Sequence, residues 1–255
     1  MTSETILAAS APVAIKPPKT LMRQIGRALI DYDMIRDGDR LLLGLSGGKD
    51  SLSLLHILRH LQSYAPVKFK LGAMTVDPQV EGFNPGFLKS YLAELDIPYF
   101  YESQPIAKQA EEQMKNDSFC SFCSRMKRGI MYTTCRREGY NVLVLAQHLD
   151  DLAESFLMSA FNGGQLRTMK ANYTNKEGDV RIIRPMVYVR ERQTADFARS
   201  AALPVVPDSC PACFAMPTER EHVKQLLARE EAHNKGLFKS LLTAIKPLMS
   251  VHTAD

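Results

Sequence analysis

The segment 46–51, with the sequence Ser-Gly-Gly-Lys-Asp-Ser, combines residue types that bind phosphate groups. It follows four leucines within residues 41–45, which predict a buried parallel strand, and it precedes apolar residues at helical spacing over 52–61. A strand, a glycine turn and a helix N-terminus form an anion site, because free backbone N–H groups and the positive end of the helix dipole face one point. Two glycines admit a phosphate where a Cβ would block it. Gly-Gly also marks ordinary tight turns, but the flanking serines and the adjoining Lys49 and Asp50 favour a phosphate site.

Two adjacent carboxylates, Asp150 and Asp151, follow a second apolar strand pattern, and His148 stands two residues before the pair. Ligands of doubly wound sheets collect at the carboxyl ends of the strands, and carboxylates suit Mg²⁺, which prefers oxygen ligands and substrate phosphates. Two aspartates can also cap a helix N-terminus, but the phosphate-binding segment in the same chain favours a metal site. We therefore expect Asp50 and Asp151 to bind Mg²⁺, and Lys49 to neutralise charge that develops on the phosphates.

Four of the five cysteines form two Cys-x-x-Cys pairs, Cys120 with Cys123 and Cys210 with Cys213. Their spacing is compatible with a four-cysteine zinc site, with a thioredoxin-like disulfide and with an iron–sulfur cluster held by thiolates. Spacing alone does not decide among these three. The fifth cysteine, Cys135, lies within a predicted helix and is interpreted as a small buried hydrophobic residue.

The composition is that of a soluble globular chain, with 255 residues, 45% hydrophobic and 24% charged. No apolar run approaches the about 18 residues of a membrane span. The N-terminus has Glu4 and no early basic residue, so we expect no signal peptide. An odd number of cysteines without a secretion signal indicates a reducing compartment, and we expect a cytoplasmic protein.

The formal charge of +4 is unevenly distributed. A basic run without acids lies beside the first cysteine pair, and a second group follows Gly163-Gly164. Such surfaces suit a nucleic-acid backbone, although a solvated helix face is the alternative for either group. The first group comprises Arg125, Lys127, Arg128, Arg136 and Arg137; the second comprises Arg167, Lys170 and Lys176.

Hydrophobic patterning predicts alternating strands and helices, which indicates crossover connections and a parallel sheet of five strands. The predicted strands are 41–45, 69–76, 97–101, 141–145 and 180–183. The predicted helices are 21–34, 52–61, 87–95, 124–137, 151–161, 192–201 and 218–233.

Residues 46–51 resemble the PP-loop of the ATP pyrophosphatases, which cut ATP between the α and β phosphates and form an adenylated intermediate. This resemblance implies a doubly wound α/β domain with ATP at the carboxyl ends of its strands. The segments 120–132 and 156–171 further resemble the tRNA 2-thiocytidine synthetases, with His-x-Asp-Asp and Ile183-Arg184-Pro185 in the order of that family.

The family resemblance implies an ATP-dependent tRNA sulfurtransferase that adenylates C2 of an anticodon-loop cytidine, position 32 of tRNA, and replaces its oxygen with sulfur. It implies ATP, Mg²⁺ and a 4Fe–4S cluster held by Cys120, Cys123 and Cys210, with one iron left open for sulfur. The implied catalytic residues are Lys49, Asp50 and Asp151, and the implied nucleotide-binding residues are Ser46, Gly47, Gly48, Lys49, Asp50, Ser51 and His148.

The expected partners are tRNA and a sulfur donor supplied by a cysteine desulfurase, without a membrane; the oligomeric state stays open, with a homodimer as one option. The expected organisation is a flexible tail at 1–19, a PP-loop domain with the Cys-x-x-Cys helix at 20–205, and a C-terminal cysteine segment with helices at 206–255. Gln147 replaces a glycine of the family, and the segment Asp208-Ser209-Cys210-Pro211 resembles the 2-thiouridine synthetases. Formation of 2-thiouridine is therefore one alternative, and a non-catalytic, zinc-stabilised RNA-binding protein is another.

Overall fold

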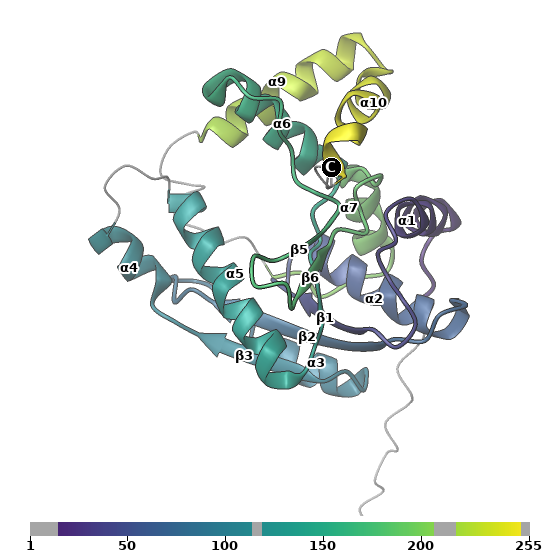
Figure 1. Cartoon of the computed structure of the whole chain (residues 1–255), viewed down its shortest axis with the longest axis vertical. Helices are drawn as coiled ribbons and strands as arrows, with labels where there is room; N and C mark the ends of the chain where they lie inside the picture. The colour runs from purple at the N-terminus through teal and green to yellow at the C-terminus, as the bar shows by residue number, and fades with distance from the viewer. Residues whose placement is uncertain (1–14, 114–118, 207–217, 251–255) are drawn as a thin grey trace, which may run out of the picture.

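A single sheet of six strands organises the fold, in the order β3-β2-β1-β4-β6-β5 (Figure 1). The computed structural model describes residues 15–113, 119–206 and 218–250. The strands are β1 Arg40–Gly44, β2 Lys70–Asp77, β3 Tyr99–Ser103, β4 Val142–Val144, β5 Asn172–Thr174 and β6 Arg181–Ile183. Pairing is parallel from β3 through to β6, which confirms the predicted parallel α/β sheet, whereas β5 joins β6 antiparallel.

The predicted count of five strands is one too low, because β5 was not recognised. This strand is the three-residue segment Asn-Tyr-Thr, which carries no apolar run and is only partly buried. It forms through its register with β6, where Tyr173 lies opposite Ile182. The residues of β5 show no strand pattern of their own, because this strand is stabilised by its pairing with β6.

The order of the strands places a topological switch point between β1 and β4. The chain runs from β1 outward to β2 and β3, then returns to form β4 on the other side of β1. Leu43 near the end of β1 lies opposite Val144 at the end of β4. The segments that follow these two strands therefore begin side by side, at the position where doubly wound sheets bind ligands.

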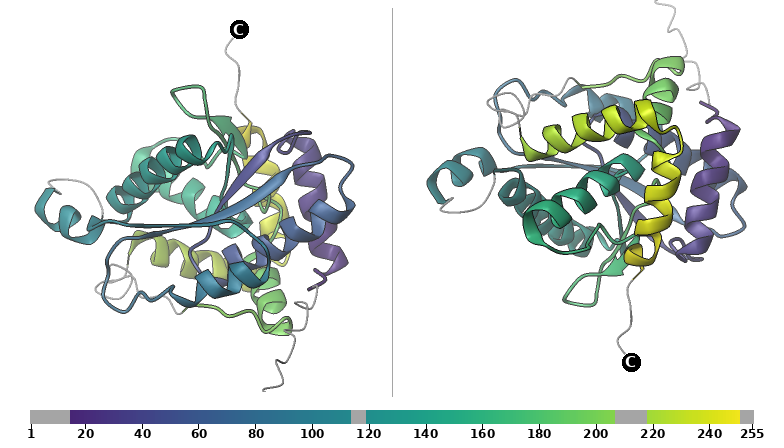
Figure 2. Two further views of the ribbon diagram at one scale, coloured as in Figure 1. Left: turned by 90° about the horizontal axis from the view of Figure 1, so that it is seen from below. Right: turned by 90° about the horizontal axis from the view of Figure 1, so that it is seen from above.

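Helices cover both faces of the sheet (Figure 2). They are α1 Lys19–Asp31, α2 Lys49–Tyr64, α3 Phe87–Glu94, α4 Ile106–Gln113, α5 Phe119–Glu138, α6 Leu149–Gly163, α7 Glu191–Ser200, α9 Glu219–His233 and α10 Leu237–Met249. Alternate residues of β1 enter different cores: Leu41 and Leu43 pack with residues of α1, α2 and α7, whereas Leu42 packs with residues of α4 and α5. Cys135 of α5 is fully buried in the second core, as predicted.

The C-terminal helices α9 and α10 pack against α6 (Figure 2). Val223 and Leu227 of α9, and Phe238 and Ile245 of α10, belong to the same hydrophobic core as α1 and α2. Helix α9 confirms the helix predicted at 218–233, whereas α4 and α10 were not predicted. The domain boundaries stay a prediction, and residues 1–14 of the predicted tail lie outside the described residues. Within the described ranges, no helix combines the length and apolar character needed to cross a membrane.

The helix that carries the first cysteine pair begins earlier than expected. The prediction started it near Ser124, but α5 begins at Phe119, so Cys120 and Cys123 are the second and fifth residues of the helix. Residues three apart in a helix share one face. The Cys-x-x-Cys pair is therefore placed on one side of α5 instead of in a preceding loop.

Candidate nucleotide and metal site

The loop between β1 and α2 adopts the shape that the sequence predicts for a phosphate site. Gly47 has a φ of +83°, and a Cβ at this residue would lie 2.4 Å from Cγ2 of Val206. The carbonyl of Gly47 also accepts the Val206 N–H at 2.9 Å. Glycine is thus required at position 47 both by its backbone angle and by the close approach of Val206.

Serine hydroxyls stabilise the loop from inside. Ser46 Oγ accepts the N–H of Gly48 at 3.2 Å, and Ser51 Oγ donates to the carbonyl of Gly48 at 3.0 Å. Gly48 is the N-cap of α2 and has no side chain that could accept N–H groups of the first turn. Those N–H groups, with the helix dipole, are available to an anion.

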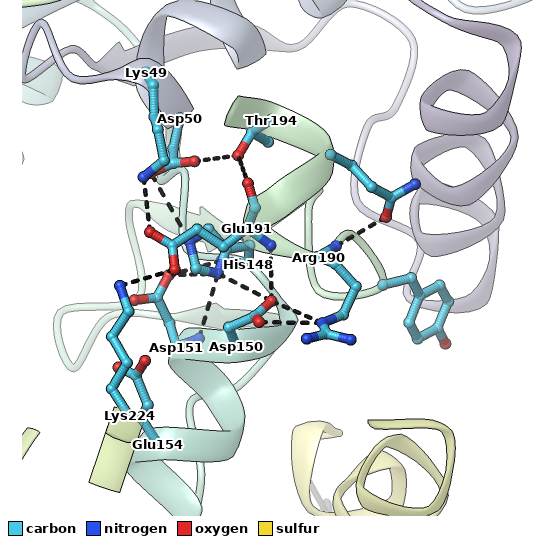
Figure 3. Close-up of polar contacts among 12 residues, drawn as sticks. Lys49, Asp50, His148, Asp150, Asp151, Glu154, Arg190, Glu191, Thr194 and Lys224 are labelled. Atoms are coloured by element: carbon cyan, nitrogen blue, oxygen red, sulfur yellow. Dashed lines mark hydrogen bonds and ion pairs between the residues drawn. The ribbon is translucent and has the colours of Figure 1, made fainter. Parts of the chain in front are cut away.

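Two residues at the start of α7 hold the side chains of Lys49 and Asp50 (Figure 3). Lys49 Nζ lies 2.9 Å from Glu191 Oε1 and 3.1 Å from Asp50 Oδ2. The hydroxyl of Thr194 contacts the other carboxylate oxygen of Asp50. Glu191 was not predicted as a site residue, because a glutamate in the first turn of a helix is common for dipole reasons alone. Thr194 was not predicted either.

The ion pairs determine the charge states of these groups. Burial opposes ionisation of Glu191, but hydrogen bonds from Lys224 and Lys49 outweigh it and lower the pKa of Glu191 to about 2. Burial likewise opposes the charge on Lys49, and the hydrogen bond to Glu191 with the nearby charge of Asp50 raises its pKa. The lysine thus keeps the positive charge that phosphate binding requires.

His148 is both the N-cap of α6 and the side chain between two predicted metal ligands (Figure 3). Its Nδ1 accepts the N–H of Asp151 at 3.3 Å, and Asp151 Oδ2 accepts the N–H of His148 at 2.9 Å. Its Nε2 lies 3.8 Å from Asp50 Oδ2. The imidazole therefore brings Asp50 and Asp151, which are a hundred and one positions apart in the sequence, to one site.

Asp150 has its own set of partners, although its Oδ2 also lies 3.8 Å from Nδ1 of His148. Its carboxylate accepts the Arg190 Nε–H at 3.1 Å and the backbone N–H of Glu191 at 2.8 Å. It is buried and fixes the start of α7. These contacts hold Asp150 against the N-terminus of α7, and a part for it in the adenylation site stays a prediction.

The described residues hold no group of three His, Cys, Asp or Glu side chains arranged for a metal ion. Asp50 and Asp151 nevertheless provide a donor set that fits Mg²⁺, which commonly takes one or two carboxylates and completes its shell with water and substrate phosphates. Their carboxylates have cationic neighbours, Lys49 beside Asp50 and Arg220 beside Asp151 at 3.1 Å.

Of the three predicted cluster ligands, only the side chain of Cys123 is described. It is half-buried on α5 beside the second core. Cys120 lies in the first turn of the same helix, and Cys210 and Cys213 lie outside the described residues. Burial raises the pKa of Cys135 to about 12, which fits its place as a neutral thiol inside the second core.

The predicted basic run on α5 is partly neutralised in the fold. Arg136 pairs with Asp179 at 2.6 Å, and Arg137 pairs with Glu102 at 2.6 Å. These acids come from the turn before β6 and from β3, so a run that lacks acids in the sequence gains them in space. The expectation of an acid-free basic surface is therefore wrong for Arg136 and Arg137.

Gln147, which departs from the family pattern, has a defined partner. Its Oε1 accepts the Nε–H of Arg184 at 3.0 Å, and Arg184 also donates to the carbonyl of Lys170 at 2.7 Å. The larger side chain thus ties the segment after β4 to a buried arginine after β6.

Comparison with known proteins is consistent with this geometry. Residues 18–230 match the PP-loop domain family. The tRNA-cytidine(32) 2-sulfurtransferase of Geobacter sulfurreducens is 40% identical over 228 residues, 89% of each chain, and that of Geobacter metallireducens is 38% identical over 91% of this chain and 90% of its own.

Among solved structures, the U34-tRNA thiolase of Methanococcus maripaludis, determined with its [4Fe-4S] cluster, has a TM-score of 0.74 at 22% identity, and covers 91% of this chain and 78% of the thiolase. This likeness supports the fold, and the family predicted from the sequence is confirmed. The chain belongs to the PP-loop family and, within it, to the family of the tRNA-cytidine(32) 2-sulfurtransferases.

Proposed function

We propose that this protein is an ATP-dependent tRNA sulfurtransferase that converts cytidine 32 to 2-thiocytidine. The observation that carries the proposal is the meeting of Lys49, Asp50 and Asp151 at the switch point between β1 and β4, in a chain 40% identical to a curated enzyme of that name. The PP-loop accounts for phosphate binding, and the substrate is inferred from the name of the curated relatives.

The first half of the reaction activates the base. The C2 oxygen of the cytidine attacks the α-phosphorus of ATP, the bond between the α and β phosphates breaks, and pyrophosphate leaves. The N-terminal N–H groups of α2 and the ammonium group of Lys49 hold the phosphates and stabilise the charge that develops on them. Mg²⁺ held by Asp50 and Asp151 would supply further charge neutralisation there.

The second half replaces AMP with sulfur at C2. Cys120 and Cys123 lie three residues apart near the start of α5, and this spacing on one helix face fits two thiolate ligands of a shared group. With Cys210 as the third ligand, they would hold a 4Fe–4S cluster that supplies an iron without a protein ligand for sulfur. A closed four-cysteine zinc site would leave no such position.

The proposed partners follow from this chemistry. The substrate is tRNA, and sulfur comes from a donor served by a cysteine desulfurase. A cytoplasmic location fits five cysteines in a thiol-preserving compartment. A homodimer remains compatible with the proposal.

The test uses variants that remove one charge at a time. Lys49→Met and Asp50→Asn should abolish thiolation and tRNA-dependent AMP formation while leaving the iron content unchanged, because Lys49 and Asp50 face the nucleotide. Lys89→Ala, at an exposed position on α3, is the matched control and should retain both activities. AMP formation by either site variant at the wild-type rate would refute the assignment of the nucleotide site.

The modified base decides between the two thiolation reactions. Nucleoside mass spectrometry of tRNA incubated with the wild-type enzyme should detect 2-thiocytidine. Detection of 2-thiouridine alone would replace the proposed substrate with the alternative one. Zinc instead of iron in anaerobically purified protein would contradict the sulfur-transfer step.

A further inference from the structure

Helix α9 brings an arginine to the carboxylates of the candidate site. Arg220 Nη1 lies 3.1 Å from Asp151 Oδ1 and 3.1 Å from Glu154 Oε2. Glu154 is buried, and this burial raises its pKa to about 7 despite the nearby guanidinium. Arg220 remains about half exposed, with 46% of its side-chain surface accessible, so its guanidinium borders both the site and solvent.

One turn further along α9, Lys224 reaches the same site. Its Nζ lies 2.9 Å from Glu191 Oε2, while the other oxygen of Glu191 accepts from Lys49 at 2.9 Å (Figure 3). One carboxylate thus bridges the lysine of the PP-loop and a lysine of α9. A phosphate group, with oxygens that accept hydrogen bonds on several sides, can bridge two ammonium groups in the same manner.

The balance of charge at the site depends on α9. The site holds the carboxylates Asp50, Asp151 and Glu191, with Lys49 as the cation from the PP-loop. Asp150 and Arg190 pair with each other and do not alter this balance. Without a metal ion, Lys49 alone would leave these carboxylates in excess by two, and Glu154, with a pKa of about 7, adds part of a further negative charge. Arg220 and Lys224 offset this excess from the protein side, in addition to the charge that Mg²⁺ on Asp50 and Asp151 would supply.

The donors on α9 also have unused capacity within the described structure. An ammonium group has three N–H donors and a guanidinium has five. Lys224 contacts only Glu191 there, and the contacts of Arg220 use only Nη1. Both side chains can therefore keep their carboxylate partners and still donate to a ligand.

We propose that Arg220 and Lys224 bind the phosphate chain of the nucleotide and complete the site that the PP-loop begins. This inference rests on the proposed function, because it assumes that the PP-loop binds ATP. Arg220 and Lys224 would contact the two phosphates that leave as pyrophosphate, beside the phosphate that Lys49 contacts.

The competing explanation is that these ion pairs only attach α9 to the core. Other contacts already do so: Val223 and Leu227 are buried, and Arg190 forms two hydrogen bonds to Glu231 at 2.7 and 2.8 Å. Half-exposed ion pairs contribute little to stability. Anchoring therefore does not require Arg220 and Lys224.

The experiment measures binding to the full-length protein in the presence of Mg²⁺, by calorimetry, with three probes. These are AMP, inorganic pyrophosphate and α,β-methylene-ATP, which cannot be cleaved at the reacting bond. Arg220→Ala and Lys224→Ala should each lower the affinity for pyrophosphate and for the ATP analogue by about tenfold, as expected for the loss of one hydrogen bond to a charged group. The affinity for AMP should stay unchanged. Lys224→Arg should retain most of the affinity. Arg229→Ala, exposed on the same helix, is the matched control and should bind all three probes as the wild type does.

The outcomes separate this inference from the proposed function. If the affinities for AMP and for the ATP analogue fell equally, these side chains would only anchor α9. A lowered melting temperature without a selective loss of affinity for the analogue would show the same. Wild-type affinity in Lys224→Ala and Arg220→Ala, with loss in Lys49→Met, would refute the role of α9 and leave the nucleotide site intact. Wild-type affinity in Lys49→Met as well would refute the nucleotide site itself.

Discussion

Gly47→Ala is the substitution whose effect the structure defines most sharply. The residue has a φ of +83°, and the new Cβ would lie 2.4 Å from Cγ2 and 3.0 Å from Cβ of Val206. The adjacent Gly48 offers a control, since its φ of −71° and ψ of 161° suit any residue. The nearest atom to a Cβ at Gly48 is Ser46 Oγ, at 3.4 Å. The two substitutions add the same methyl group one position apart.

The expected cost has two separable parts. A left-handed backbone costs a non-glycine residue about 1–2 kcal/mol. Forcing a methyl group against the buried Val206 adds about 1–3 kcal/mol, the usual range for overpacking. Gly47→Ala should therefore lower the free energy of unfolding by about 2–5 kcal/mol, whereas Gly48→Ala at a helix N-cap should lower it by about 1 kcal/mol or less.

A double-mutant cycle separates the two parts. Val206→Ala removes the atom that the new Cβ meets first, Cγ2, so Gly47→Ala should cost less in the Val206→Ala background, by about 1–3 kcal/mol. The remaining cost of about 1–2 kcal/mol is mainly the backbone strain, which Val206→Ala cannot relieve, together with the contact to Cβ of residue 206 at 3.0 Å, which alanine keeps. Urea denaturation of the wild type, both single variants and the double variant provides all four free energies.

Two results would refute this reasoning. If Gly47→Ala were no more destabilising than Gly48→Ala, the loop would not have the positive φ described. If the cost of Gly47→Ala were the same with valine and alanine at position 206, Val206 would not lie against the PP-loop. The affinity for α,β-methylene-ATP should follow the same order, because the loop that binds phosphate is the one that is distorted.

Further predictions concern pH, salt and the cysteines. Burial, with a smaller effect of Arg59, lowers the pKa of His56 to about 4, whereas the unfolded side chain titrates near 6.5. The unfolded chain therefore binds this proton more tightly, and the free energy of unfolding should fall by about 3 kcal/mol as the pH is lowered from 6.5 to 4. His56→Gln should remove this part of the pH dependence. An unchanged pH profile in the variant would contradict the prediction. The affinity for tRNA should fall steeply as the salt concentration rises. Lys127→Gln should reduce the slope of the logarithm of affinity against the logarithm of salt concentration by about one. Arg136→Gln should leave this slope unchanged, because Asp179 already pairs with Arg136. Anaerobic Cys213→Ala should keep its iron and activity while Cys120→Ala, Cys123→Ala and Cys210→Ala lose both; iron loss in Cys213→Ala with retention in Cys210→Ala would reverse the assignment.

The elements predicted correctly are those whose signals are local. The leucines of β1, the glycine turn and the helical spacing of α2 are contiguous in the sequence, and together they define a phosphate site. Strand β5 was missed because it depends on β6, and α10 was missed although it buries Ile245 and Met249, since its apolar stripe includes Pro247. A proline within a helical pattern normally indicates that the helix ends there.

The candidate site was predicted in its residue types but not in its contacts. Lys49, Asp50 and Asp151 were identified from the motifs, and the structure brings them together around His148 and Glu191. Glu191 could not be identified, since its role is created by the arrival of α7 beside the PP-loop. The same limitation applies to the acids that neutralise Arg136 and Arg137, which come from distant segments.

Asp150 and Asp151 show how far a motif can be interpreted. They are identical residues at consecutive positions in the first turn of α6, and both lie near His148. Asp150 nevertheless accepts from Arg190 and from the backbone of α7, whereas Asp151 pairs with Arg220. Consecutive helix positions point about 100° apart, so the two carboxylates necessarily meet different neighbours. The motif determines that two carboxylates stand at the carboxyl end of β4. Which of them pairs with Arg190 and which with Arg220 is determined by the positions of α7 and α9.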